Sequence, residues 1–472
     1  MALLCLTQFV VVLDVAIVNV ALPDVGRELG FAPRDLQWVV NAYTLTFAGL
    51  LLLGGRLADL VGRRRVFVAG LVLFGVASLA GGLSVGPGML VASRAVQGVG
   101  AALLSPAALA LLNSTYAQGP ARNRALAVWG GTAGSGAAAG VLLGGVLTST
   151  LGWQWVLLVN VPIVLVAVLA APALLADGRD EDLPRSFDLP GAFLVTAGSV
   201  ALVYAVVSIE SAGLGSAQTL LVLAAGAASL TAFVAVERRA AAPLVPLGVF
   251  RQRNLTGANV VFLLHPTGPT AVLFLGSLYL QDVLGYGALE NGLAFLPFAV
   301  LAAGGAAVAG RLLRRVRPER LAAVGMASMA VGLALLSRLS DTSTFWTGVL
   351  PGTALTGIGI TVAFVPLTVL AFTGLPHEQH GWASGLINTF QQFGAALVLA
   401  VLATLAGSST AGRLAAGVPE QSALADGIAR AFGAGAVLLA VGAALVLVLL
   451  RPKGRGPAES GTATDPAVEV VR

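Results

Sequence analysis

The feature that most constrains this chain is a series of fourteen apolar segments, each long enough to cross a lipid bilayer as a helix. A transmembrane helix needs about 20 predominantly apolar residues, and clusters of Pro, Gly and charged residues separate the segments. Their approximate limits are 2–22, 36–54, 66–85, 88–112, 125–149, 153–175, 189–210, 217–236, 255–281, 291–310, 321–338, 345–372, 384–406 and 428–450. Charged residues make up only 10% of the 472 residues, against about 25% in soluble domains. The sequence therefore predicts an all-α polytopic membrane protein.

Several function classes are excluded by the same composition. Lys453 is the single lysine, so no P-loop can form, and Cys5 is the single cysteine, so there is no disulfide framework. His377 and His380 stand one residue too close for the H-E-x-x-H zinc motif. The predicted spans contain no cluster of nucleophile, base and metal ligands. We therefore expect no enzymatic activity, no metal, no cofactor and no nucleic-acid partner, despite a formal net charge of +5.

The basic residues predict the orientation of the chain in the membrane. If both termini are cytoplasmic, twenty of the 27 basic residues lie in cytoplasmic loops or at the start of the tail, and five lie in outer loops. Cytoplasmic loops carry such an excess of Arg and Lys. We expect a multi-pass protein of a bacterial plasma membrane. Apart from Arg472 at the end of the tail, only Arg94 falls outside these loops, because it lies inside a span.

A weak internal repeat indicates how the segments are grouped. The tripeptide Gly-Arg-Leu at 55–57 recurs at 310–312, each time before an arginine cluster and the third helix of a six-helix set. The repeat predicts two six-helix halves with an insert between them. The expected domains are an N-terminal bundle at 1–175, a two-helix insert with cytoplasmic linkers at 176–253, a C-terminal bundle at 254–451 and a disordered tail at 452–472.

Arg94 needs a partner inside the membrane, because an arginine at the centre of a span costs about 2.5–3.5 kcal/mol on insertion scales. Arg94 lies seven residues from Pro87 at the outer end of its segment, a depth of about 10 Å. Asp14 is the only acid well inside any span, nine residues from Pro23, a depth of about 13 Å. The similar depths predict a buried pair that takes part in proton coupling. Two alternatives are an Arg94 that snorkels to the outer interface and a pair with a purely structural role.

Residues 55–65 read G-R-L-A-D-L-V-G-R-R-R. Gly55 and Gly62 permit a tight turn, Asp59 can lie against positive helix N-termini, and Arg63 and Arg64 hold the next helix at the cytoplasmic side. By charge alone this is also an ordinary positive-inside loop. The full pattern resembles the signature loop of the major facilitator superfamily, which implies that these five residues form a gating loop that latches the two halves together.

Other segments resemble one branch of that superfamily. Residues 94–102 are similar to the helix-4 motif R-x-x-Q-G-x-G-x-A of drug/proton antiporters, in which the arginine is implicated in proton coupling. Residues 13–23 and 153–162 resemble motifs of the fourteen-span branch. The resemblance implies a major facilitator fold of 14 transmembrane helices, made of two six-helix bundles and two extra central helices. It also implies proton-coupled export of amphipathic drug-like compounds by alternating access.

Val141 departs from that resemblance, because the antiporter motif of the fifth helix has a proline there. The kink credited to that proline is therefore expected to be absent. Gly136, Gly140 and Gly144 recur at i, i+4 and i+8, a spacing that allows close helix contact in membranes. A packing role for this stripe competes with a role in antiport.

In the second half, the run from His265 to Pro269 contains two prolines and a glycine and predicts an interruption of the span at 255–281. Interrupted helices line transporter cavities. His265 is a candidate second proton site, because histidine titrates near neutral pH; the alternative is a neutral histidine that satisfies freed backbone groups.

Polar side chains within the spans are candidates to line a substrate cavity. They are Asn19, Gln97, Asn160, Asn259, Asn388 and Gln391. A packing hydrogen bond explains Gln391 equally well. The expected partners are a small amphipathic substrate, protons and the lipid bilayer, with the chain acting as a monomer. Two other functions stay open: a dedicated exporter of a single metabolite or antibiotic, and a transport-dead membrane sensor.

Overall fold

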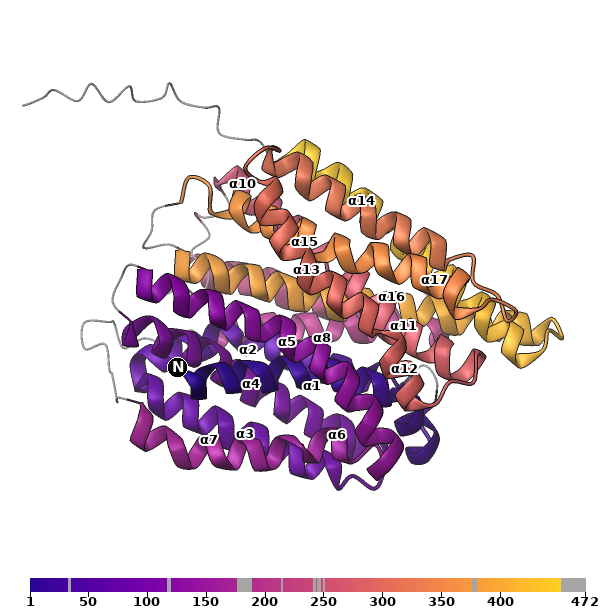
Figure 1. Ribbon diagram of the computed structural model, residues 1–472, viewed down its shortest axis with the longest axis horizontal. Helices are drawn as coiled ribbons and strands as arrows, with labels where there is room; N and C mark the ends of the chain where they lie inside the picture. Colours follow the sequence, from indigo (N-terminus) through magenta and orange to yellow (C-terminus); the bar gives the residue numbers. More distant parts are fainter. Residues whose placement is uncertain are drawn as a thin grey trace, which may run out of the picture.

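The computed structural model describes residues 1–32, 35–116, 120–175, 189–213, 215–240, 243, 248, 251–375 and 380–450. Within these ranges the regular secondary structure is entirely helical (Figure 1). Most of the predicted linkers at 176–188 and 241–250, residues 376–379 and the tail from 451 lie outside the described residues.

The first half of the chain forms seven helices. They are α1 (Ala2–Leu29), α2 (Trp38–Val61), α3 (Arg63–Gly82), α4 (Pro87–Thr115), α5 (Pro120–Leu151), α6 (Trp155–Leu158) and α7 (Asn160–Leu174). Gly30 ends α1 in the left-handed conformation, at φ 69°, which glycine adopts without steric cost. Pro87 begins α4, where its missing N–H leaves no helical hydrogen bond unmade.

Two expected boundaries are wrong in this half. Helix α1 continues through Pro23 to Leu29, although a proline removes one helical hydrogen bond. Pro23 and Val25 are buried, and this packing offsets the loss. Helix α2 continues to Val61 instead of ending near residue 54, so the expected loop between α2 and α3 is reduced to Gly62, at φ 117°.

Two helices lie between the halves in sequence. Helix α8 (Leu189–Ala212) packs on α9 (Ala217–Glu237) and also contacts α2 and α16. Ser216 caps α9, since its hydroxyl accepts a hydrogen bond from the backbone N–H of Thr219 at 3.1 Å. Most of the apolar surface of α9 is exposed, as expected of a helix that faces lipid.

The second half forms the remaining helices. They are α10 (Arg253–Leu264), α11 (Thr267–Leu278), α12 (Ala288–Ala294), α13 (Leu296–Leu312), α14 (Pro318–Leu336), α15 (Leu350–Phe372), α16 (His380–Ala415) and α17 (Glu420–Leu449), with π-helical turns η2 (Tyr279–Val283) and η3 (Phe345–Val349). The predicted interruption is confirmed, because α10 ends at Leu264 and α11 begins at Thr267.

In space, α1 to α7 occupy one side of the molecule and α10 to α17 the other, with α8 between them (Figure 1). The two groups touch where α1 meets α11, α5 meets α12 and α13, and α2 meets α16. One apolar core cluster lies within the first group, and the larger cluster contains residues of both.

Eleven helices in the described part are long and apolar enough to cross a membrane. Shorter apolar stretches lie at 38–51 in α2, 139–151 in α5 and 193–206 in α8. The fold is thus an all-helical membrane fold. The count of fourteen spans stays a prediction.

Candidate functional site

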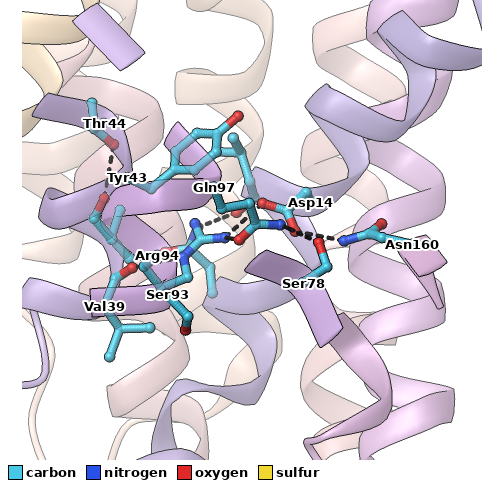
Figure 2. Close-up of polar contacts among 12 residues, drawn as sticks. Asp14, Val39, Tyr43, Thr44, Ser78, Ser93, Arg94, Gln97 and Asn160 are labelled. Carbon is cyan, nitrogen blue, oxygen red and sulfur yellow. Dashed lines mark hydrogen bonds and ion pairs between the residues drawn. The ribbon is translucent and has the colours of Figure 1, made fainter. Parts of the chain in front are cut away.

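Asp14 of α1 and Arg94 of α4 form an ion pair inside the first bundle, which is the group of helices α1 to α7; helices α10 to α17 are the second bundle. The Nη1 atom of Arg94 lies 2.6 Å from Oδ2 of Asp14, and the two side chains are 1% and 0% exposed. The pair predicted from depth is therefore present (Figure 2). The snorkelling alternative for Arg94 is wrong, because the guanidinium stays buried beside its partner.

Two side-chain amides complete the surroundings of the Asp14 carboxylate. Gln97 of α4 and Asn160 of α7 each donate a hydrogen bond to Oδ1 at 2.8 Å. Gln97 also accepts a bond from Arg94 Nη1 at 2.6 Å and donates one to the Ser78 hydroxyl at 2.8 Å. All three neighbours donate to Asp14, so its carboxylate serves only as an acceptor, as an ionised carboxylate does.

Arg94 has two further contacts, both with α2. Its Nε donates to the carbonyl of Val39 at 2.9 Å, and its guanidinium carbon lies 4.4 Å from the centre of the Tyr43 ring. A cation over an aromatic face is favoured by about 0.5–2 kcal/mol. The network therefore joins α1, α2, α3, α4 and α7 around one positive and one negative charge (Figure 2).

Small residues bring these helices together. A Cβ added at Gly136, Gly140 or Gly144 of α5 would lie 2.9, 2.7 or 2.9 Å from a backbone carbonyl oxygen of α1. The predicted close contact is confirmed, and it braces the segment of α1 that carries Asp14. On α4, Gly98 lies directly against the backbone of α2, and Gly100 faces α3.

Residues 4–399 match the sequence profile of the Major Facilitator Superfamily. The chain belongs to this superfamily. It is therefore a polytopic membrane transporter, and the two groups of helices are arranged as a major facilitator fold.

Curated relatives are similar over most of their length. The puromycin resistance protein pur8 of Streptomyces alboniger is 42% identical over 97% of this chain and 92% of its own. The cephamycin export protein CmcT of Amycolatopsis lactamdurans is 45% identical over 87% of this chain and 85% of its own. The multidrug resistance protein Stp of Mycobacterium tuberculosis is 33% identical over 84% of this chain and 73% of its own.

Solved structures share the fold at low sequence identity. A crystal structure of the peptide transporter POT in complex with sulfate superposes with a TM-score of 0.67 and 17% identity, covering 95% of each chain. This likeness concerns the fold alone.

The superfamily's signature segment differs in form from the expected loop. Gly55 and Asp59 lie in the last turns of α2, and Arg63 and Arg64 begin α3. The tight turn expected at Gly55 is therefore wrong: the helix runs on through it, and only Gly62 has a positive φ. Arg64 donates from Nη1 to the carbonyl of Leu175 at 3.2 Å. The side chain of Asp59 lies outside the described residues.

His265 lies in the second bundle and has different neighbours. It is 4% exposed, and its Nε2 is 2.9 Å from the carbonyl oxygen of Ile360 on α15. The rings of Phe262 and Phe364 lie 6.2 and 5.9 Å from its own. These contacts agree with the alternative of a neutral histidine bound to a backbone group.

The candidate cavity residues divide into three groups. Gln97 and Asn160 belong to the Asp14 network, whereas Asn19 donates to the Val15 carbonyl within its own helix at 2.7 Å. Asn259 is buried, and neither atom of its amide has a hydrogen-bond partner in the part of the chain that the structure describes. Within the described residues, Asn388 is exposed, Gln391 is partly exposed, and neither amide has a hydrogen bond, so the packing bond considered for Gln391 is not present there.

Sequence reasoning missed Tyr43 and Ser78. Both are buried and both contact the charged network. A tyrosine in an apolar span was a usable signal, since aromatic rings bind cations. Its position could not identify Arg94 as the partner, because the sequence does not show which helices are neighbours.

Proposed function

We propose that this chain is a proton-coupled secondary transporter that exports amphipathic drug-like compounds by alternating access. The buried Asp14–Arg94 pair carries the proposal, because ionisable residues inside a membrane domain are costly and mark ion or proton pathways. The names of the curated relatives, which include an export protein and resistance proteins, support the direction of transport. We place the chain in a bacterial plasma membrane, as a monomer with both termini cytoplasmic, on the arginine bias and the source of those relatives.

In this proposal the proton binds to the carboxylate of Asp14. A proton there removes the negative charge that Arg94 faces. It also turns the carboxyl group into a hydrogen-bond donor, although Arg94, Gln97 and Asn160 all direct donors at it. At least one neighbour must turn away or offer an acceptor. Gln97 is suited to this, because its amide oxygen, which now accepts from Arg94, can turn to accept from the protonated Asp14. The amide nitrogen would then face Arg94, which has no acceptor, so Arg94 must also move away.

Helix α1 provides a route from this event to the second bundle. Gln281 of η2 donates from Nε2 to the Val20 carbonyl at 2.9 Å. Arg27, at the end of α1, lies 3.2 Å from Asp282. Asp14 is on the same helix, held by α4 and α7. Neutralising Asp14 loosens α1 from its own bundle, and we propose that the contacts of α1 with η2 break as the outer side opens.

For the substrate contact we propose Asn259 of α10. A buried amide without a partner costs about 1–3 kcal/mol, and a polar group of the substrate could satisfy both of its atoms.

Reconstituted vesicles with an imposed pH gradient test the proposal. A fluorescent amphipathic substrate should move against its concentration gradient only while the proton gradient lasts, and a protonophore should stop it. Gradient-independent movement would contradict proton coupling. If no compound of a broad panel is transported, the alternative of a transport-dead membrane sensor is favoured.

A second candidate is a dedicated exporter of one metabolite or antibiotic. The relatives with 42% and 45% identity are named for single compounds, whereas the relative named for multidrug resistance is 33% identical. A panel of chemically unrelated substrates in the same vesicles separates the candidates, because a dedicated exporter moves one compound class and a multidrug exporter moves several.

A further inference from the structure

A cavity far from the Asp14 network collects three arginines at the end of the second bundle. It has a volume of about 570 Å³, and its lining includes Arg338 just after α14, Arg413 near the end of α16 and Arg430 of α17. These are three of the five arginines assigned to the outer side by sequence. In Figure 1 the α16–α17 end lies at the right, opposite the labelled N terminus.

Only one of the three positive charges has an acidic partner in the described part of the chain. Arg413 donates from Nε to Asp426 at 2.6 Å, and its Nη2 is also 2.6 Å from that carboxylate. Arg338 and Arg430 are exposed, and neither guanidinium has a hydrogen bond or ion pair there. With Asp426 as the only acid in its lining, the cavity has a net charge of two positive units and free donors in the planar geometry that suits phosphate oxygens.

We propose that this cavity binds a phosphate group, carried by an anionic phospholipid or free in solution. The surrounding surface favours the lipid. Val437 lies seven residues after Arg430 in α17, so it is about two helical turns deeper in the membrane on the same face. Val331 lies in the last two turns of α14, which ends two residues before Arg338. Both valines are exposed, at 53% and 63%, and α14 packs against α17. A headgroup in the cavity would thus place its acyl chain on an apolar surface.

The geometry makes this site independent of the proposed transport mechanism. Arg338, Arg413 and Arg430 have no hydrogen bond or ion pair with Asp14 or Arg94 in the described part of the chain. Basic pockets between transmembrane helices on the cytoplasmic side hold anionic headgroups, and the same charge chemistry applies at the outer side. Because both unpaired arginines are exposed, their replacement should leave the fold intact.

Binding of fluorescent phosphatidylglycerol to the purified full chain in a neutral detergent tests the proposal. The double variant Arg338→Gln/Arg430→Gln should weaken binding at least tenfold, since each charge-assisted bond is typically worth about one decade in affinity. Arg314→Gln/Arg315→Gln, which removes two exposed charges at the opposite end, is the matched control and should bind as the wild type does. Arg430→Lys should bind more tightly than the double variant but less tightly than the wild type, because the positive charge remains and the planar set of donors is lost.

Competition identifies the source of the phosphate. If the ligand is a lipid, unlabelled phosphatidylglycerol displaces the probe and millimolar inorganic phosphate does not. If inorganic phosphate displaces the probe as well, the site accepts the free ion. Equal affinity of the wild type and the Arg338→Gln/Arg430→Gln variant for phosphatidylglycerol and for inorganic phosphate would overturn the proposal.

Discussion

The two bundles bury titratable side chains in different ways. Asp14 and Arg94 lie in the first bundle among side chains from five helices, and each of the pair is held by several polar contacts. His265 is equally buried in the second bundle, but its contacts are one backbone carbonyl and two aromatic rings. A change of charge at Asp14 therefore alters contacts between helices, whereas His265 can remain neutral without any rearrangement.

The comparison shows that burial alone does not identify a coupling site. What distinguishes Asp14 is that its partners come from two other helices, α4 and α7, and that its own helix also touches the second bundle. Within the described residues, the buried network that contains an ion pair occurs in the first bundle, whereas Gln281, Ser277 and Asn291 form an uncharged one in the second. The following experiments test this asymmetry, beginning with the largest expected effect.

Asp14→Asn should reduce gradient-driven efflux to the level of empty vesicles. The amide keeps hydrogen-bonding capacity but cannot exchange a proton, so the driving force is uncoupled. Efflux of a fluorescent substrate under an imposed pH gradient provides the measurement. Asp426→Asn, the same chemical change at the partly exposed pair with Arg413, which has no part in the proposed coupling route, is the control and should retain transport.

The purely structural alternative for this pair has its own test. Asp14→Asn/Arg94→Gln removes both charges, so no uncompensated charge stays buried and the fold should be retained. If this double variant pumps against a gradient as the wild type does, the pair is structural and Asp14 is not the proton site.

Arg94→Ala should cost about 3–5 kcal/mol of unfolding free energy, because it leaves the buried Asp14 carboxylate without its partner. Unfolding in detergent, followed by loss of helical circular dichroism, measures the change. Arg413→Ala breaks the exposed pair with Asp426 and should cost only about 0–1 kcal/mol. Equal losses in the two variants would mean that the Asp14–Arg94 pair is not a buried interaction in the membrane.

Asn160→Ala should lower the unfolding free energy by about 1.5–3 kcal/mol, because one hydrogen bond to the charged Asp14 carboxylate is lost. Because Asn160 is one of the donors to the Asp14 carboxylate, its loss alters the proposed proton site, and the pH profile of efflux should change. Asn19→Ala serves as the control, because that amide bonds only within α1 among the described residues and should leave the pH profile unchanged. An unchanged pH profile for Asn160→Ala would mean that the hydrogen bond from Asn160 of α7 to Asp14 takes no part in proton coupling.

His265→Gln should have the smallest effect. Glutamine can donate to the Ile360 carbonyl, so the expected stability loss is below about 1.5 kcal/mol, and gradient-driven efflux should persist. The pH profile of efflux and the unfolding transition together test this. Loss of pH-driven efflux with a normal unfolding transition would instead place a second proton site in α10–α11.

A large part of the candidate site could be predicted from the sequence. The depth of Arg94 and Asp14 predicted their pairing, and the spacing of Gly136, Gly140 and Gly144 predicted the close contact with another helix. Both inferences rest on regular helical geometry, which relates residue number to depth and to face. The interruption at Pro266 was predictable for the same reason, because proline removes a helical hydrogen bond.

Other features depended on which helices become neighbours. Tyr43 and Ser78 join the network because α2 and α3 pack on α4, and no local pattern encodes that choice. The continuation of α2 through Gly55 also escaped prediction, since a glycine-containing polar segment is compatible with a turn and with a helix end. Likewise, Arg338, Arg413 and Arg430, of which the first and last are 92 positions apart in the sequence, meet in one cavity only through the packing of α14, α16 and α17.

The sequence by itself determined that this chain is a helical membrane protein with one deep charge of each sign, because the bilayer admits few structures and penalises unpaired charge. The tertiary structure decided which side chains contact Asp14 and Arg94, and it placed His265 away from both. The physical reason is that hydropathy and helix geometry act along one helix, whereas hydrogen bonds and ion pairs act over about 3 Å between helices.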